Sequence, residues 1–326
     1  MAILAIRHLT RYRYRKPVGL GEHRMMLRPL ESYDQRVISS SLTISPQPSH
    51  LRHVHDVFGN CVGVARFAGR TRELVFESRV TLDHRPVAAF EGVDGELEAY
   101  ASAAPFAYSP PFPYSPEDLP DLLRSMERAH ADPDGLLERW ARGFLRRDGR
   151  TGLQALLAQM TQAIYSDFRY ATRLHGPPKS PLETLSSRTG TCRDFAVLMM
   201  EAVRSLGLAA QFVSGYIYTP PRTYSGLTSL GGGHTHAWVR VYLPACGWVE
   251  FDPTNGIVGN TDLVRVAIAR DPRQATPLCG SWSGQAGDFL DMEVEVDVTS
   301  DEDAGAGRNT KVLSQPPFGE DVALTG

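Results

Sequence analysis

Cysteine is scarce in this chain, and its spacing excludes two common roles. Four cysteines are spread over 326 residues, too few and too scattered for a disulfide scaffold. None of them has the CxxC spacing of a zinc site. In a reducing compartment an isolated cysteine is more often a small core side chain than a reagent. We expect that role for Cys61, Cys246 and Cys279.

The chain also lacks a long apolar run and a large excess of either charge. Arg7 interrupts the N-terminus before a stretch of signal-peptide length, and no segment approaches the ~20 apolar residues of a membrane span. We therefore expect a cytoplasmic protein with no membrane partner. The net charge of −3 gives no basic excess for nucleic acid, so we expect no nucleic-acid partner either.

The pattern of strands, helices and prolines divides the chain into five parts. Short strand-like runs separated by Gly, Pro, Asn and Asp predict an N-terminal β-sandwich. The Pro-rich stretch that follows predicts a linker. The polar stretch at the end of the chain has no hydrophobic periodicity and predicts disorder. The predicted parts are a β-sandwich domain at 1–98, a linker at 99–116, a core with a helical lead-in at 117–258, strands that complete the core at 259–298, and a disordered tail at 299–326.

The segment RTGTCRDFAVLMM, residues 188–200, places Cys192 at the start of a predicted helix. Thr191 and Asp194 fit the Ser/Thr-x-x-Asp/Glu capping pattern, and Gly207 predicts where the helix stops. Helix N-termini favour the thiolate form of a cysteine. Their free backbone N–H groups can also bind an oxyanion that develops on a carbonyl. The position makes Cys192 a candidate nucleophile.

A nucleophilic cysteine needs a base and a group that orients this base, and segment 234–252 offers both. His236 and Trp238 share one face of a predicted strand. After the PACG turn, GWVEFDPT returns antiparallel. If even-numbered residues pair with even-numbered ones, which requires a loop of odd length, Asp252 lies beside His236 on that face.

Other interpretations of these residues stay open. His236 beside Trp238 fits a core histidine, and Asp194 fits a helix cap better than a catalytic role. A zinc site could instead combine His234 and His236 with the aspartate or the cysteine. The histidines at 50, 53 and 55 have no cysteine or carboxylate at ligand spacing. We predict that the protein holds no metal and no cofactor.

Taken in order, the segments GTCRDFA, HTHAW and GWVEFDPT closely resemble the core shared by transglutaminases, peptide N-glycanases and many bacterial cysteine protease candidates, the transglutaminase-like superfamily. The match covers about 150–256, and the β-rich region before it resembles the N-terminal domain of the bacterial members. The resemblance implies an α+β, papain-like core in which a cysteine-bearing helix packs on an antiparallel sheet. It implies Cys192 as nucleophile, His236 as general base and acid, and Asp252 as the residue that orients the imidazole.

The same resemblance suggests supporting residues. An upstream side chain usually contributes to the oxyanion hole in this family, and Tyr170 in DFRY is the candidate. Asp194 and Trp238 are the other candidate supporting residues. His234 departs from the family pattern, where small or polar residues are usual, and its role is open. No calcium loop of the animal transglutaminase kind is visible.

From these residues we expect a thiol-dependent amide hydrolase or acyltransferase, a cysteine protease type, that acts on a peptide or protein substrate through a thioester acyl-enzyme. Hydrolysis is favoured over transamidation, because water is abundant and no amine pocket is evident. The alternative is a protein-binding scaffold with a vestigial core. The glycines and prolines of 219–233 further predict a loop that covers the cleft.

Overall fold

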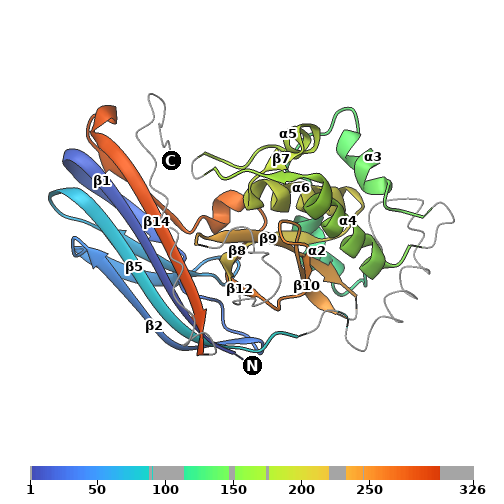
Figure 1. The fold of residues 1–326 in the computed structure, drawn as a ribbon, viewed down its shortest axis with the longest axis horizontal. Coiled ribbons are helices and arrows are strands. Elements are labelled where there is room, and N and C mark those ends of the chain that lie inside the picture. The colour runs from blue at the N-terminus through green and yellow to red at the C-terminus, as the bar shows by residue number, and fades with distance from the viewer. Residues whose placement is uncertain are drawn as a thin grey trace.

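The computed structural model describes residues 2–87, 90, 114–146, 151–173, 176–219, 233–244 and 246–301. These residues form two large, antiparallel sheets and one short parallel pair of strands. In Figure 1 the N-terminal sheet stands on the left, and the helices lie with the second large sheet on the right. The fold is therefore α+β, as the sequence predicts.

The N-terminal region is built around one long strand. The five N-terminal strands pair in the order β2-β5-β1-β4-β3. The side chains of β5 alternate between buried and more exposed positions over most of its length, which is typical of a sheet with one face on a core. A tight turn joins β3 to β4, and Gly59 at φ 79° supplies its left-handed residue. The strands are β1 (Ala2–Met25), β2 (Gln35–Ser45), β3 (His50–His55), β4 (Cys61–Arg66) and β5 (Arg70–His84).

Two strands from the end of the described chain join this same N-terminal sheet. β13 (Leu278–Ser283) and β14 (Phe289–Ser300) both pair with β1. This pairing corrects the prediction that 259–298 as a whole completes the core, because only β12 (Leu263–Ala269) joins the core sheet. Alternating hydrophobicity identifies a strand but does not identify its partner.

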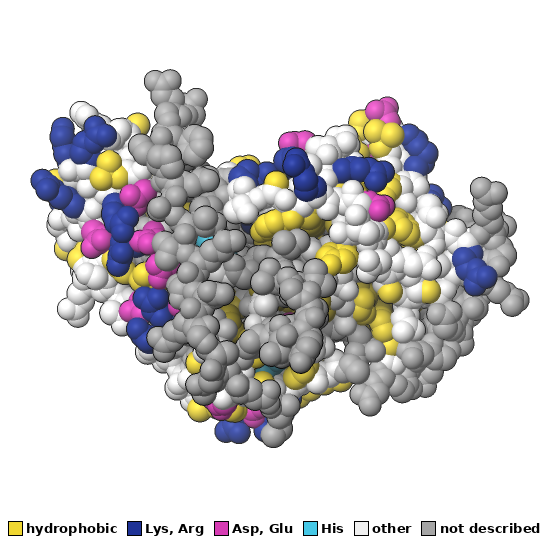
Figure 2. All heavy atoms as spheres, viewed as in Figure 1, with side chains coloured by type: hydrophobic (Ala, Val, Ile, Leu, Met, Phe, Trp, Pro, Cys, Tyr) yellow, Lys and Arg dark blue, Asp and Glu magenta, His cyan; other side chains and the backbone are white. Residues whose placement is uncertain are grey.

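Opposite charges match β14 to β1. The arginines of β1 face acidic residues of β14, and cross-strand pairs of opposite charge stabilise a sheet. Figure 2 shows dark blue and magenta side chains close together on the left of the molecule, where Figure 1 labels β1 and β14. These pairs include Arg7–Glu295 at 3.1 Å, Arg11–Glu293 at 3.2 Å, Arg13–Glu293 at 3.0 Å and Arg13–Asp291 at 3.2 Å.

The core sheet has the strand order β11-β10-β9-β8-β12. Four of its five strands, β8 to β11, lie side by side in chain order, and only β12 crosses over to pair with β8. Neighbours in the chain are therefore mostly neighbours in the sheet. Its strands are β8 (Ala210–Ile217), β9 (His236–Leu243), β10 (Gly247–Asp252), β11 (Ile257–Val258) and β12. The parallel pair is β6 (Arg169–Tyr170) with β7 (Thr189–Gly190). The helices are α2 (Leu119–Met126), α3 (Leu136–Arg142), α4 (Leu153–Asp167), α5 (Pro181–Ser187) and α6 (Cys192–Ser205), with short turns η1 (Pro272–Ala275) and η2 (Ala286–Asp288).

Helix α6 is the centre of the core. Nearly all of its side chains are buried, and it packs on the odd-numbered face of β9, which includes Ala237, Val239 and Val241. Burying one large apolar side chain contributes about 1.5–3 kcal/mol. Packing on this scale fixes where the first residue of the helix lies relative to the sheet. The helix ends at Ser205, and Gly207 follows at φ 82°.

A buried polar network joins the N-terminal sheet to the core sheet. The Asn60 side chain donates through Nδ2 to the backbone oxygen of Ile268 at 2.7 Å and accepts from its N–H at 2.9 Å. Arg265 of β12 makes ion pairs with Asp34 and with Glu250. Buried polar groups are costly unless they are paired. The network therefore sets one relative position of the two sheets.

Apart from the segment 259–298 and the start of the tail, the predicted domain boundaries stay predictions. Residues 99–113 of the predicted linker, 220–232 of the predicted cleft loop and 302–326 of the predicted tail lie outside the described residues. The start of the predicted tail is corrected, because Thr299 and Ser300 belong to β14.

Replacing Asn60 with alanine should weaken the junction between the sheets. The substitution removes both hydrogen bonds to Ile268 and leaves two backbone groups unpaired, so we expect the free energy of unfolding to fall by about 2–4 kcal/mol. Urea denaturation followed by circular dichroism measures this change. Ser49→Ala, which removes one exposed hydroxyl bonded to the Arg66 carbonyl, is the control. A loss no larger than that of the control would contradict the role given to Asn60.

Candidate active site

Helix α6 begins at Cys192 because a capping box closes its first turn. The Thr191 side chain accepts from the Asp194 N–H at 3.4 Å, and the Asp194 Oδ2 accepts from the Thr191 N–H at 2.8 Å. The predicted cap is therefore confirmed. Cys192 is 7 % exposed. It is the first residue of the helix, where the positive end of the helix dipole favours an anion.

The second carboxylate oxygen of Asp194 ties a neighbouring segment to the helix start. Oδ1 accepts from the Arg173 guanidinium at 2.8 Å and from the Lys179 backbone N–H at 2.7 Å. Asp194 is fully buried. It positions the helix start and residues 171–173 and 176–180, which agrees with the predicted capping role.

The pairing of β9 with β10 places the predicted base beside its predicted partner. Trp248 pairs with Tyr242, and Glu250 pairs with Arg240, so even-numbered residues face even-numbered ones. The predicted register, in which even-numbered residues pair with even-numbered ones, is therefore confirmed. Nε2 of His236 lies 2.8 Å from Oδ2 of Asp252. Both residues are buried: His236 is 1 % exposed and Asp252 is 0 % exposed.

Two further groups hold the Asp252 carboxylate, and neither of them is among the residues predicted from the sequence. Oδ1 accepts from the Thr254 N–H at 2.9 Å, and Oδ2 accepts from the Asn255 side-chain amide at 2.8 Å. The segment DPTN does carry a pattern that predicts the bond from Thr254. An aspartate that opens a turn often accepts a hydrogen bond from the backbone N–H two residues later. These bonds leave the carboxylate little freedom to rotate.

The environment of His236 favours its charged form. Burial by itself lowers the pKa of His236, but the Asp252 carboxylate and the Cys192 side chain outweigh burial and raise the pKa to about 10. The pKa of Asp252 moves the other way: burial raises it, and the stronger effect of His236 with Asn255 and Thr254 leaves it below its ordinary value. An imidazolium beside a carboxylate is therefore the stable state of this pair.

Cys192 lies close enough to the His236 imidazole to affect its charge state. Nε2 is engaged by Asp252, and Nδ1 makes no hydrogen bond of standard geometry within the described part of the chain. The Cys192 side chain is nevertheless among the groups that raise the His236 pKa. Catalytic hydrogen bonds are often long or poorly aligned before a substrate binds. The structure thus brings Cys192, His236 and Asp252 together.

The predicted supporting residues lie around this set. Trp238 is fully buried, and its ring centroid lies 5.8 Å from that of His236 at an interplanar angle of 31°. Tyr170 ends β6, and its pKa is raised by burial and then by the nearby Cys192, with a smaller effect of Asp252. Tyr170 is therefore within electrostatic range of the thiol. His234 lies half-buried just before β9.

Two of the other three cysteines, Cys61 and Cys279, differ from their predicted role as core side chains, whereas Cys246 packs against the core. Cys279 is exposed, and Cys61 and Cys246 are half-buried, whereas Cys192 is buried. Cys279 points outward because β13 alternates in burial and places it on the exposed face. All four are free thiols.

Within the described ranges, no three His, Cys, Asp or Glu side chains are grouped so that they could hold a metal ion. In the same ranges, no helix combines the length and the apolar character that crossing a bilayer requires.

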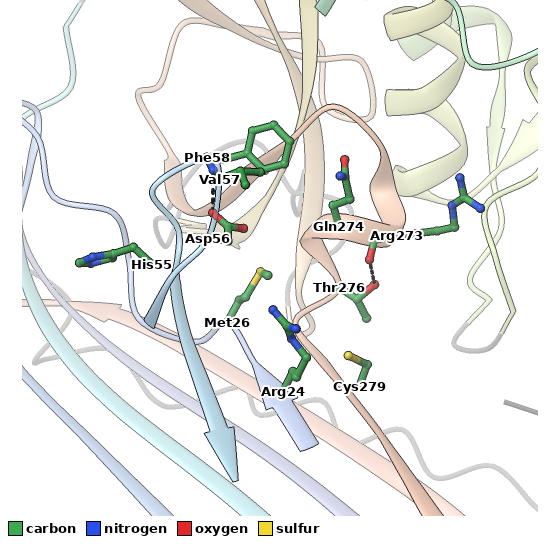
Figure 3. A pocket seen from close by; sticks show the side chains of 10 residues that line it. All are labelled: Arg24, Met26, His55, Asp56, Val57, Phe58, Arg273, Gln274, Thr276 and Cys279. Carbon is green, nitrogen blue, oxygen red and sulfur yellow. Dashed lines mark hydrogen bonds between the residues drawn. The ribbon is translucent and has the colours of Figure 1, made fainter. Parts of the chain in front are cut away.

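A hollow of about 510 Å³ lies between the end of β1, the β3–β4 turn and η1. Figure 3 shows the side chains around it, which include charged and apolar groups. None of the predicted site residues lines this hollow. We therefore locate the candidate active site by its chemistry, at Cys192. The lining residues are Arg24, Met26, His55, Asp56, Val57, Phe58, Arg273, Gln274, Thr276 and Cys279.

The fold and this set of residues define a transglutaminase-like protein, and comparison with known families agrees. The model of the bacterial transglutaminase-like N-terminal region matches residues 4–83, and that of the transglutaminase-like superfamily matches residues 141–253. The chain belongs to the transglutaminase-like superfamily and carries the N-terminal region of its bacterial members.

Individual relatives extend the comparison. The chain is 29% identical over 301 residues to an uncharacterized protein of Mycobacterium tuberculosis, a match that covers 89% of this chain and 91% of that one. It is 28% identical over 107 residues to a protein-glutamine gamma-glutamyltransferase of Pseudomonas aeruginosa, covering 31% of this chain and 16% of that one. A crystal structure of a candidate cysteine protease from Cytophaga hutchinsonii shares the fold, with a TM-score of 0.64, 19% identity, and coverage of 98% and 95%.

Replacing Asp252 with asparagine should change how stability depends on pH. In the unfolded chain His236 titrates near its ordinary pKa of 6.5, whereas the folded value is about 10. A raised folded-state pKa contributes stability that is fully present below the unfolded pKa and is lost as pH rises through the folded one. The gap in unfolding free energy between wild type and Asp252→Asn should therefore be largest near pH 6 and shrink toward pH 10.

Urea denaturation of both proteins between about pH 5.5 and 10 measures this gap. The lower limit keeps the carboxylates ionised in both states. A gap of constant size across this range would mean that Asp252 does not raise the His236 pKa.

Proposed function

We propose that the protein is a thiol-dependent amide hydrolase that acts on peptide or protein substrates through Cys192. The observation that carries the proposal is the position of His236, whose Nε2 is bound to Asp252 and whose charge state also responds to Cys192. A nucleophile, a base and a group that orients the base are the parts that covalent amide chemistry requires. Membership of the transglutaminase-like superfamily supports the same chemistry.

The first half of the proposed reaction forms a thioester. The proton of the Cys192 thiol passes to His236, whose raised pKa favours the imidazolium, and the sulfur attacks the carbonyl carbon of the amide. Backbone N–H groups at the start of α6 donate to the resulting oxyanion, and the Tyr170 hydroxyl is the proposed additional donor. The carbon–nitrogen bond then breaks, and the imidazolium of His236 gives its proton to the leaving amine. An acyl group remains on the sulfur.

The second half releases the acyl group. His236 takes a proton from water, the hydroxide attacks the thioester carbonyl, and the carbon–sulfur bond breaks. The product is a carboxylic acid, and the sulfur recovers its proton from the imidazolium. Asp252 stays ionised throughout and stabilises the imidazolium that forms twice in the cycle. Acid–base catalysis of this kind contributes roughly 10²–10⁴-fold to the rate.

A primary amine is the competing acceptor. In that case the amine nitrogen attacks the thioester, and the product is a new amide. The relative from Pseudomonas aeruginosa named protein-glutamine gamma-glutamyltransferase favours this second candidate function. We keep hydrolysis as the proposal, because water needs no binding pocket of its own.

The alternative is a binding scaffold that keeps the core without its chemistry. A scaffold has no physical need for a buried histidine whose Nε2 is engaged by a carboxylate and whose pKa is also raised by a nearby thiol. The intact set of Cys192, His236 and Asp252 therefore supports the enzyme.

Substitution of the nucleophile and of the base tests the proposed reaction. We expect Cys192→Ala to abolish cleavage of a peptide library, and His236→Ala to lower the rate by at least about 100-fold, because acid–base catalysis is lost. Mass spectrometry of the products, with and without an added primary amine, measures cleavage and separates hydrolysis from transamidation. Cys61→Ala is the matched control and should keep full activity.

Retained activity in Cys192→Ala would refute the assignment of the nucleophile. A wild-type protein that modifies no member of the library would favour the scaffold.

A further inference from the structure

A segment before the catalytic helix lies against the start of α6 and carries basic side chains. Arg193, the residue after Cys192, donates from its two terminal nitrogens to the carbonyls of Gly176 and Arg173, both at 3.1 Å. The Lys179 ammonium donates to the carbonyl of Thr189 at 3.2 Å and approaches the Ser187 hydroxyl at 3.4 Å. Neutral oxygens therefore hold both cations.

The carboxylates in this neighbourhood do not balance the positive charge. Arg173 is paired with the buried Asp194 at 2.8 Å. The carboxylate nearest Lys179 belongs to the more exposed Glu183, 3.9 Å away. Among the described residues Arg193 has no carboxylate within ion-pair distance. A carbonyl orients a guanidinium but does not cancel its charge, so Arg193 and Lys179 leave a positive field around this end of the helix.

This field reaches the active site. Arg193 follows Cys192 directly in the first turn of α6. It also acts electrostatically on Tyr170, the same side chain that responds to Cys192 and Asp252. Figure 2 shows dark blue Lys and Arg side chains gathered over the part of the molecule that Figure 1 labels α5 and β7, the elements next to the start of α6.

We propose that Arg193 and Lys179 make the approach to Cys192 selective for acidic acyl donors, in which a carboxylate lies next to the scissile amide. The proposal rests on the proposed function and names its substrate class as acidic peptides. A carboxylate brought to this end of the helix would meet Arg193, which has no carboxylate partner among the described residues, and Lys179, whose nearest carboxylate is the more exposed Glu183 at 3.9 Å. A substrate with a basic residue in the same place would be repelled.

Alkylation of the Cys192 thiol tests the field without any need for turnover. Iodoacetate carries a carboxylate and iodoacetamide does not, yet both react by the same displacement, in which a sulfur–carbon bond forms and iodide leaves. The ratio of their rates at Cys192, measured by mass spectrometry of the full chain, reports how strongly the site attracts an anion. Iodoacetamide alone reports whether the thiol is intact and accessible.

We expect Arg193→Gln to lower the iodoacetate-to-iodoacetamide ratio by about 3- to 10-fold, the size of a partly screened charge interaction. Arg193→Lys keeps the charge but loses the fork that binds two carbonyls, so it should keep most of the ratio. Arg66→Gln removes an equal charge from β4 of the N-terminal sheet and should leave the ratio unchanged. High salt should reduce the wild-type ratio toward that of Arg193→Gln.

A ratio that is unchanged in Arg193→Gln and in the double variant Arg193→Gln with Lys179→Gln would overturn the proposal. A ratio that falls equally in Arg193→Lys and Arg193→Gln would also overturn it, because Arg193 would then act only by holding the segment. Both results are independent of whether the protein cleaves peptides.

A matched pair of peptides then tests the substrate class. If the wild type cleaves peptides, kcat/KM should be higher for a glutamate than for a glutamine beside the scissile amide, and Arg193→Gln should remove the preference. Equal kcat/KM values for the two peptides in the wild type would contradict the acidic substrate class.

Discussion

The buried hydrogen bond between His236 and Asp252 is the contact on which the arrangement of the site depends. It requires β9 and β10 to pair in the observed register, because a slip of one residue would turn Asp252 to the opposite face of the sheet. With Nε2 engaged, only Nδ1 is left for Cys192. One hydrogen bond thus fixes which ring nitrogen faces the carboxylate and, with it, the orientation of the ring.

The start of α6 is the second constraint, and it depends on one carboxylate. Asp194 closes the capping box with Thr191 and at the same time holds the segment that carries Arg173 and Lys179. The thiol, the base and the proposed cationic approach are therefore fixed to the same core. This explains how a chain with a small share of helix can place chemistry from distant segments at one point.

Much of the site could be predicted from short patterns. The capping box at Thr191 and the stop near Gly207 follow from local chemistry, and these predictions are confirmed. The register of β9 and β10 follows from the alternation of side chains along each strand and from the odd number of residues in the loop between them. It could therefore be predicted as well. These features depend on residues that are close in the sequence.

Contacts between distant segments were harder to predict. The segment DMEVEVDV predicts a strand, but it does not predict that this strand, β14, pairs with β1, which lies about 290 residues earlier in the chain. The acidic residues of β14 complement the arginines of β1. Asn255 was missed because an amide that binds a carboxylate from a turn has no periodic pattern. The exposure of Cys279 depends on which face of β13 meets the core, and this too depends on a distant partner.

Titration of the His236 imidazole by nitrogen-edited NMR tests the central claim most directly, namely that the Cys192 thiol and this imidazole act on each other. In the wild type the ring should titrate near a pKa of about 10. In Cys192→Ala the pKa should be measurably lower, because one of the groups that raise it is gone. Identical titration curves for the two proteins would show that the thiol and the imidazole do not interact, and the proposed chemistry would lose its basis.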